Sequence, residues 1–184
     1  MEVEKSRETF DYTAKRGTLH SEIALPEDAP AWIRDRLGVG AGFPSGYPIV
    51  GEQAVFGSGR LWNAVEQAEG RKDSQYARET LIALPVELTR EQNIELVREF
   101  VAEHLTAKGL VVDWAFHEPD KQQRNPHVHI LTTLRPLTDE GFGRKTRVRR
   151  DADGEIIRTQ KGAVCYEGWV GGKTELREWR SAWA

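Results

Sequence analysis

The chain has 184 residues, of which 39% are hydrophobic and 30% charged, the composition of one soluble globular domain. A net charge of −3 argues against indiscriminate polyanion binding, and the single cysteine, Cys165, excludes a disulfide framework and a cysteine-based zinc site. No apolar run is long enough to span a membrane, and the charged start MEVEKSRETF is unlike a signal peptide, so we expect a cytoplasmic protein.

The first part of the chain predicts a strand, a long loop and a short helix. Residues 17–26 have a β-rich pattern that ends at Pro26. Residues 37–59 contain seven glycines and two prolines without periodicity, which predicts a loop insertion within one domain. Apolar residues at helical spacing then predict a helix over 60–71.

The middle of the chain predicts a strand followed by the longest helix. Residues 78–85 form a β-rich run that a proline ends. Thr89 and Gln92, three positions apart, are typical of a capping box at a helix N-terminus. Apolar residues follow on one helical face until Gly109, where we expect the helix to stop.

A hairpin and a final helix complete the predicted order. The β-rich runs 110–117 and 127–134 are separated by a polar loop, the pattern of two antiparallel strands. The tail TELREWRSAWA, from residue 174, is expected to be helical. The order of elements predicts an α+β fold over residues 1–184, with an antiparallel β-sheet flanked by helices.

Three of the five histidines lie in the predicted hairpin. Side chains alternate between the two faces of a strand, so His127 and His129 share one face. The loop should bring His117 of the neighbouring strand close to His127, and the small Ala115 would leave space above His129. Three imidazoles on one face are a ligand set for a divalent metal, since imidazole suits Zn, Mn, Fe, Co, Ni or Cu. The expected cofactor is a divalent metal: Mg, Mn or Zn. The structural alternative is that these histidines only pack on a half-exposed sheet.

Three nearby polar residues are candidates to support such a site. A ligating imidazole usually donates its other N–H to a carboxylate or carbonyl, and Glu79 and Asp113 are the acids best placed to approach. A surface ion pair is the alternative role of either acid. Asn125 precedes the second histidine strand and is expected to brace the loop or contact DNA. For His20 and His104 we expect purely structural roles.

A basic segment follows the hairpin. The stretch GFGRKTRVRR, residues 141–150, carries five cations and no acid. Such a run is compatible with a solvated loop, or with a strip that contacts the phosphate backbone of a nucleic acid. The candidate DNA contacts are Arg144, Lys145, Arg147 and Arg149.

The stretch RNPHVHILTTLR resembles the H-x-H motif of the MobA/MobL plasmid mobilisation relaxases, in the wider His-hydrophobic-His endonuclease group. The blocks DYTAKRGTLHSEIALPEDAP, LWNAVEQAEGRKDSQYARETLIALPVELTREQ and GFGRKTR are also similar to family blocks, in family order. The resemblance implies a relaxase-like (HUH-endonuclease-like) fold that holds a metal on His117, His127 and His129. It further implies metal-dependent, site- and strand-specific nicking of single-stranded DNA at a plasmid transfer origin by transesterification. Accessory mobilisation proteins are expected as further partners.

One departure from the family concerns the nucleophile. Family members carry the catalytic tyrosine in an N-terminal block that is not recognisable in this sequence, and Tyr12, Tyr47, Tyr76 and Tyr166 do not match it. Tyr12 is the weak remaining candidate, so the catalytic residue is unknown. We therefore expect a chain truncated at its N-terminus, with an incomplete N-terminal strand. Two alternatives stay open: a relative that binds DNA without nicking, and a three-histidine metalloprotein unrelated to DNA.

Overall fold

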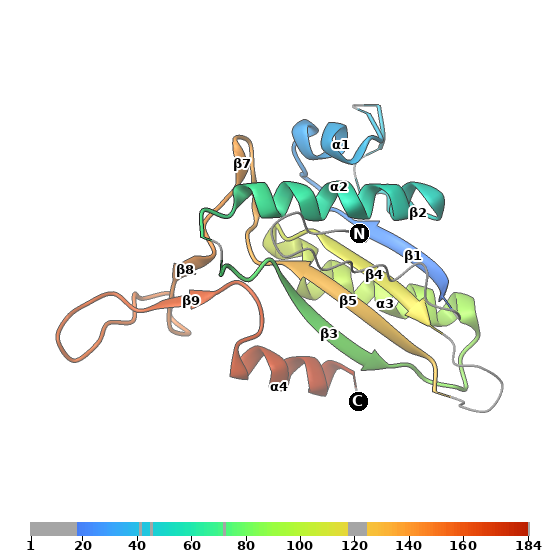
Figure 1. Ribbon diagram of the computed structural model, residues 1–184. Helices are drawn as coiled ribbons and strands as arrows, with labels where there is room; N and C mark the ends of the chain where they lie inside the picture. Colours follow the sequence, from blue (N-terminus) through green and yellow to red (C-terminus); the bar gives the residue numbers. More distant parts are fainter. Residues whose placement is uncertain (1–17, 41, 45, 72, 118–124, 184) are drawn as a thin grey trace.

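The computed structural model describes residues 18–40, 42–44, 46–71, 73–117 and 125–183 (Figure 1). The strands are β1 (Thr18–Ala24), β2 (Ile49–Val50), β3 (Ala77–Ala83), β4 (Val112–His117), β5 (His127–Thr133), β6 (Leu137–Thr138), β7 (Gly141–Phe142), β8 (Thr146–Val148) and β9 (Tyr166–Gly168). The helices are α1 (Ala31–Leu37), α2 (Glu52–Ala68), α3 (Arg90–His104), the short 3₁₀ helix η1 (Thr106–Lys108) and α4 (Lys173–Ala182).

Five strands form the main sheet, in the order β2-β1-β4-β5-β3, and every neighbouring pair is antiparallel. The strand at residues 17–26, the strand at 78–85, the histidine hairpin and the C-terminal helix therefore form as predicted, and the α+β class is confirmed. Thr89 and Gln92 make the predicted reciprocal capping box at the start of α3. Residues 1–17, where an incomplete N-terminal strand was expected, and the hairpin loop 118–124 lie outside the described residues.

Helices cover both faces of the sheet. Figure 1 shows α2 across one face and α3 behind the other. On the α3 face, the inward side chains of β4 and β5 join residues of α3 and α4 in one core: Trp114, Phe116, Val128, Ile130, Val97, Phe100, Val101 and Trp179. On the opposite face, α1 and α2 pack on β1 and β2 through Ile33, Leu37, Leu61, Trp62, Val65, Ile23 and Ile49. Alternation along β4 and β5 thus places the large apolar residues under α3 and the histidines on the α2 face.

The loop expected over residues 37–59 is shorter than predicted. Helix α2 begins at Glu52, so residues 52–59 are helical, and it ends at Ala68. Gly57 is buried in this helix, and a Cβ there would lie 3.0 Å from Cδ1 of Ile23. The glycine therefore allows the helix to approach the sheet closely, although the glycine content of residues 37–59 had predicted a loop.

The basic segment leads into a projecting ribbon that we call the arm, residues 146–168. Strands β8 and β9 pair at its base, and Figure 1 shows the rest extending away from the sheet. Beyond the base, three backbone hydrogen bonds form a ring, from Arg149 to Cys165, from Cys165 to Ile157 and from Ile157 to Arg149. Two turns branch from this ring, and in each the preceding arginine binds a glycine carbonyl: Arg150 to Gly154 and Arg158 to Gly162. The arm is therefore a β-structure with two similar turns, and only its first residues, 146–150, belong to the basic segment.

A partly buried carboxylate joins α2 to the sheet. Oδ2 of Asp113 on β4 accepts hydrogen bonds from the Ser58 hydroxyl at 2.6 Å and the Trp62 indole N–H at 2.8 Å, both from α2. Burial raises the pKa of Asp113, and the two hydrogen bonds oppose that rise only in part. Asp113 was predicted to orient a histidine; instead it holds the helix, because it lies four residues before His117, under α2.

Within the described residues, no helix has both the length and the apolar character to cross a membrane.

Asp113 predicts a pH-dependent stability. A carboxyl group can have a higher pKa in the folded than in the unfolded protein. Its contribution to folding stability is then fully present at pH values below the unfolded pKa, near 3.9. That contribution is lost as pH rises through the folded pKa, by about 1.4 kcal/mol per unit of pKa difference. Asp113→Asn keeps an acceptor for Ser58 and Trp62 but cannot ionise, so its stability relative to the parent should increase as pH rises from about 4 through the folded pKa of Asp113.

Urea unfolding of both proteins across this pH range measures the difference directly. The other acids titrate equally in the two proteins, so their contributions cancel. A difference in unfolding free energy that stays constant with pH would contradict the proposed titration of Asp113.

Candidate functional site

The three hairpin histidines meet on the α2 face of the sheet. The antiparallel register of β4 and β5 pairs His117 with His127 and Ala115 with His129, as predicted. The ring centroids are 5.6 Å apart for His117 and His127, 5.0 Å for His117 and His129, and 5.2 Å for His127 and His129. Rings that bind one ion through nitrogens at about 2.0–2.1 Å have centres roughly 5 Å apart, so the spacing fits a shared ion.

Each imidazole is held through Nδ1 by an oxygen of the protein. Nδ1 of His129 lies 2.9 Å from Oε1 of Glu79, and Nδ1 of His127 lies 3.0 Å from the carbonyl oxygen of Asn125. Nδ1 of His117 lies 3.5 Å from the hydroxyl of Thr18 on β1. Such contacts set the orientation of an imidazole and make Nε2 the nitrogen through which it would bind an ion.

The cluster is not a complete metal cage. Among the described residues, no three His, Cys, Asp or Glu side chains stand in an arrangement that could hold a metal ion. The rings of His117 and His127 are nearly parallel, with an interplanar angle of 13°. The ring spacing fits an ion, and rotation about the side-chain torsions would be needed to direct the ligand nitrogens at one point.

The histidine face is open on the side of β3. Leu81 lies opposite His129 in the β3–β5 register, and 61% of its surface is exposed. The Glu79 side chain, on the same face of β3, is also largely accessible, whereas that of His129 is only 17% exposed. The imidazoles therefore form the floor of a surface that has α2 on one side and an accessible strand edge on the other.

The predicted supporting residues divide into two groups. Glu79 contacts a histidine as expected, and Asn125 does so through its backbone carbonyl and not its side chain. Asp113 binds α2, as described above.

The two histidines outside the hairpin lie away from the cluster. His20 lies on the opposite face against Trp114, with Nε2 2.9 Å from Glu22, and His104 packs on an aromatic ring of α3. Both have the structural roles that were expected.

The basic segment is partly committed to internal contacts. Lys145 binds the buried carboxylate of Glu69 at 2.9 Å, and Arg147 pairs with Glu167 and lies over the ring of Trp169. Arg144 and Arg149 are exposed, and neither side chain makes an ion pair with a described residue. Of the four predicted DNA contacts, these two are therefore the exposed cations whose charge no described acid neutralises.

None of the described tyrosines lies beside the histidines. Tyr47 precedes β2, and Tyr166 is on the arm, 62% exposed. Tyr76 precedes β3, near the opposite end of β5 from His127, and burial together with the charges of Glu66 and Glu69 raises its phenol pKa. A raised pKa disfavours the phenolate, the nucleophilic form. Tyr12 lies outside the described residues.

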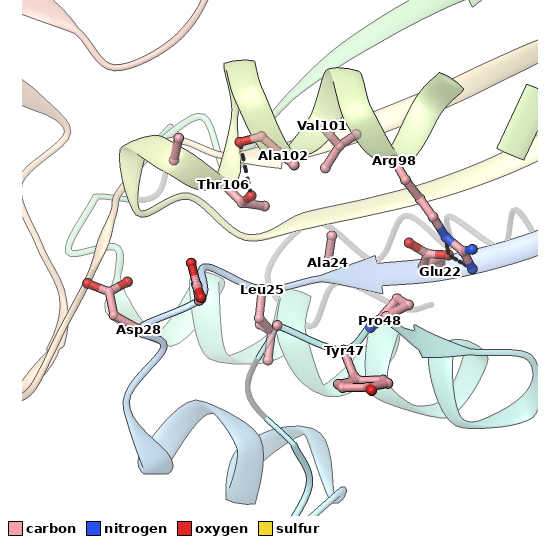
Figure 2. Close-up of a pocket in the computed structure, with 13 residues that line it drawn as sticks. Glu22, Ala24, Leu25, Asp28, Tyr47, Pro48, Arg98, Val101, Ala102 and Thr106 are labelled. Carbon is pink, nitrogen blue, oxygen red and sulfur yellow. Dashed lines mark hydrogen bonds and ion pairs between the residues drawn. The ribbon is translucent and has the colours of Figure 1, made fainter. Parts of the chain in front are cut away.

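A separate cavity of about 770 Å³ opens on the α3 face, between β1, α3 and the segment before β2 (Figure 2). Glu22 is buried there and binds the guanidinium of Arg98 at 2.9–3.0 Å. Glu27 and Asp28 also line the cavity, so its charge is mainly negative. It contains none of the three clustered histidines and offers a poor surface for phosphate groups.

Sequence reasoning missed the residues that come from distant segments. Thr18 reaches His117 across β1 and β4, and Ser58 and Trp62 reach Asp113 from α2. Ser58 was assigned to a loop, so its place on the helix could not be anticipated. A helical reading of residues 52–68, with Ala54, Leu61 and Val65 on one buried face, would have identified the helix side that meets the sheet.

Comparison with known proteins agrees with this structure. The sequence model of the MobA/MobL family matches residues 1–184. The conjugal transfer protein TraA of Rhizobium radiobacter is 44% identical over 184 residues, which is all of this chain and 15% of that protein. The probable mobilization protein MobA of Bifidobacterium longum is 33% identical over 140 residues, 76% of this chain and 21% of that protein. This chain thus spans only a small part of these relatives.

A solved structure has the same fold. One chain from "Molecular Basis of Vancomycin Resistance Transfer in Staphylococcus aureus" superposes with a TM-score of 0.59 and 32% sequence identity. The match covers 99% of this chain and 73% of that one, which confirms the relaxase-like α+β fold. Together with the family match over the whole chain, these similarities show that the chain belongs to the MobA/MobL family of plasmid mobilisation and conjugal transfer proteins.

Proposed function

We propose that this chain is the nicking domain of a mobilisation relaxase, which uses a divalent metal to cleave one strand of DNA at a transfer origin. The observation that carries the proposal is the convergence of three imidazoles, with ring centroids 5.0–5.6 Å apart, on the open face of the sheet. Membership of a family of mobilisation proteins supplies the substrate class. We also propose a cytoplasmic location, which a role on plasmid DNA would require.

His117, His127 and His129 would hold the metal through their Nε2 atoms. A divalent ion bound there would offset the charge that develops on the oxygens of a scissile phosphate. Glu79 fixes the orientation of His129, and the Asn125 carbonyl fixes that of His127. The accessible strand β3 leaves room for single-stranded DNA to lie across the histidines, with exposed Arg144 and Arg149 available to its backbone farther along.

DNA binding without nicking is the second candidate function. It is favoured by the position of the described tyrosines, since none of the three lies beside the histidine cluster. Both candidates require DNA binding, and only the first requires a phosphodiester bond to break. A metalloprotein unrelated to DNA would bind the ion and ignore the nucleic acid.

Strand cleavage is the direct test of the proposed function. The chain, and a version extended by all in-frame upstream sequence of its gene, are incubated with Mn²⁺ or Mg²⁺ and single-stranded DNA from its plasmid transfer origin. We expect the extended protein to form a covalent protein–DNA adduct, detected as a shifted band after denaturation, and to lose it with EDTA. DNA binding without any adduct would select the second candidate, and absence of DNA binding would refute both.

The histidine cluster predicts metal binding that specific substitutions abolish. In His127→Ala or His129→Ala, isothermal titration with Mn²⁺ should detect no high-affinity site. Each variant keeps only two of the three imidazole ligands, which are too few to hold the ion tightly. Folding should change little, since both side chains are only partly buried and neither belongs to the apolar core. His104→Ala, which removes an imidazole from α3, is the matched control and should bind Mn²⁺ like the parent.

Glu79→Gln tests orientation without removing a ligand. It should weaken Mn²⁺ binding by roughly 10- to 100-fold, as expected when a partner of a ligating histidine is altered. Binding that survives intact in His127→Ala and His129→Ala would place the metal elsewhere and remove the basis of the proposal.

Neutralising exposed cations should affect DNA binding and not the metal. In Arg144→Gln together with Arg149→Gln, the slope of log affinity for single-stranded DNA against log salt should fall by about 1.4, near 0.7 for each lost phosphate contact. Fluorescence anisotropy over a salt series measures this slope, and Mn²⁺ titration of the same variant should be unchanged. An unaltered slope would show that these side chains do not contact phosphates.

A further inference from the structure

Glu69, at the C-terminal end of α2, is a buried carboxylate between two cations. Its side chain is only 3% exposed. Its Oε1 accepts a hydrogen bond from Nε of Arg135 at 2.9 Å, and its Oε2 accepts one from Nη2 of Arg135 at 3.3 Å. Nζ of Lys145 also lies 2.9 Å from Oε2. We refer to Glu69, Arg135 and Lys145 as the Glu69 cluster.

The two cationic side chains that bind Glu69 also donate hydrogen bonds to backbone carbonyls in other parts of the chain. Nη1 of Arg135 donates to the carbonyl of Gly143 at 2.8 Å, and Nζ of Lys145 donates to the carbonyl of Gln75 at 2.6 Å. The cluster therefore joins the end of α2, the segment after β5, the segment before β3 and the residue that precedes the arm. No other ion-pair cluster among the described residues joins as many elements around the histidine face.

Within the part of the chain that the structure describes, the arm is attached to the rest of the protein at both of its ends. After β9, Val170 is buried in the α3-side core. Before β8, the attachment is the Glu69 cluster, through Lys145. The contacts of Arg147 with Glu167 and Trp169 hold the base of the arm together and do not fix its direction.

The Glu69 cluster has strong electrostatic coupling. Burial alone would raise the pKa of Glu69, but the hydrogen bonds and charges of Arg135 and Lys145 hold it below its ordinary value, so the carboxylate is ionised. Removing the negative charge would leave two partly buried cations facing each other without compensation. The attachment should therefore loosen when Glu69 is neutralised.

We propose that Glu69 is a positioning residue that fixes the arm relative to the histidine face, and that Lys145 affects DNA binding only through this attachment. The proposal rests on the proposed function, because it takes DNA as the ligand of the arm and the histidine face. It assigns a new role to Lys145, which the basic sequence alone predicted to contact phosphate. A lysine whose ammonium group already binds a carboxylate and a carbonyl has one N–H left for a phosphate, and the charge of Glu69 offsets its own.

The direction of the arm is measured without metal or DNA. In a Cys165→Ser background, spin labels on cysteines at Gln53 of α2 and Gln160 in the arm report the distance between helix and arm. The distance distribution should be single and narrow in the parent and broad in Glu69→Gln and in Lys145→Met. Asp73→Asn is the matched control: it removes one negative charge from an exposed acid close to Glu69 and should leave the distribution narrow. Unchanged distributions in both cluster variants would overturn the attachment.

A double-mutant cycle separates positioning from direct contact. Affinity for a fluorescein-labelled single-stranded oligonucleotide of mixed sequence is measured over a salt series, well below the melting temperature of every variant. Glu69→Gln and Lys145→Met should each weaken binding roughly three- to tenfold with the salt slope of the parent, and the double variant should be no weaker than the weaker single variant. If Lys145 contacts phosphate instead, Lys145→Met lowers the salt slope by about 0.7. The fold-losses in affinity of the two single variants then multiply in the double variant.

These measurements also separate the proposal from the proposed function. A parent that does not bind DNA would refute the proposed function and the positioning role together, while the distance distributions would still decide whether the Glu69 cluster fixes the arm. Normal DNA binding with unchanged distributions would refute the positioning role and leave the proposed function intact.

Discussion

The antiparallel register of β4 and β5 is the constraint on which the histidine cluster depends. It places His117 directly opposite His127, and the small Ala115 opposite His129, so three rings fit in a space that larger neighbours would close. The same register buries Trp114, Phe116 and Ile130 under α3. A slip of one residue would exchange the two faces and bury imidazoles in the apolar core, at a high free-energy cost. The hydrophobic effect thus fixes the polar site, because the core and the cluster are opposite sides of the same two strands.

Two carboxylates, one buried and one partly buried, place the elements that surround this site. Asp113 holds the middle of α2 to β4, and Glu69 holds the end of α2 to the segments that flank β5 and β3. Their electrostatics differ in sign. Asp113 has only neutral donors, so burial dominates and its pKa rises, whereas two cations keep Glu69 ionised. Above the unfolded pKa of Glu69, its pairing with Arg135 and Lys145 stabilises the fold, and this stabilisation is lost as pH falls through the folded pKa. For Asp113, a fall in pH instead removes the cost of keeping a charged carboxylate away from water. Acid should therefore loosen the arm before it loosens the middle of α2.

Local sequence patterns predicted much of this architecture, and long-range contacts account for most of the rest. Alternation in β4 and β5 and the spacing of Thr89 and Gln92 are local signals, and both features form as expected. Asp113 and Ser58 are 55 residues apart, and Glu69 and Arg135 are 66 apart, so no local pattern identifies either pair. Lys145 shows the consequence: a run of cations is readable from sequence, but which of them is already neutralised by a buried acid is not.

The distribution of charge shows how a chain of net charge −3 could still select one face for a polyanion. The cavity on the α3 face is lined by Glu22, Glu27 and Asp28, and its one arginine is already paired with acids, so that face repels phosphate. The histidine face contains imidazoles, an accessible strand and, toward the other end of β5, the exposed cations at the base of the arm. The seven residues of β5 span roughly 20 Å, several nucleotides of DNA backbone. A strand that contacted both ends would run along β5, because the histidines and the cations are at opposite ends of it. The position of the arm relative to β5 would then determine which phosphate reaches the imidazoles, and a rigid attachment at Glu69 would make that choice precise.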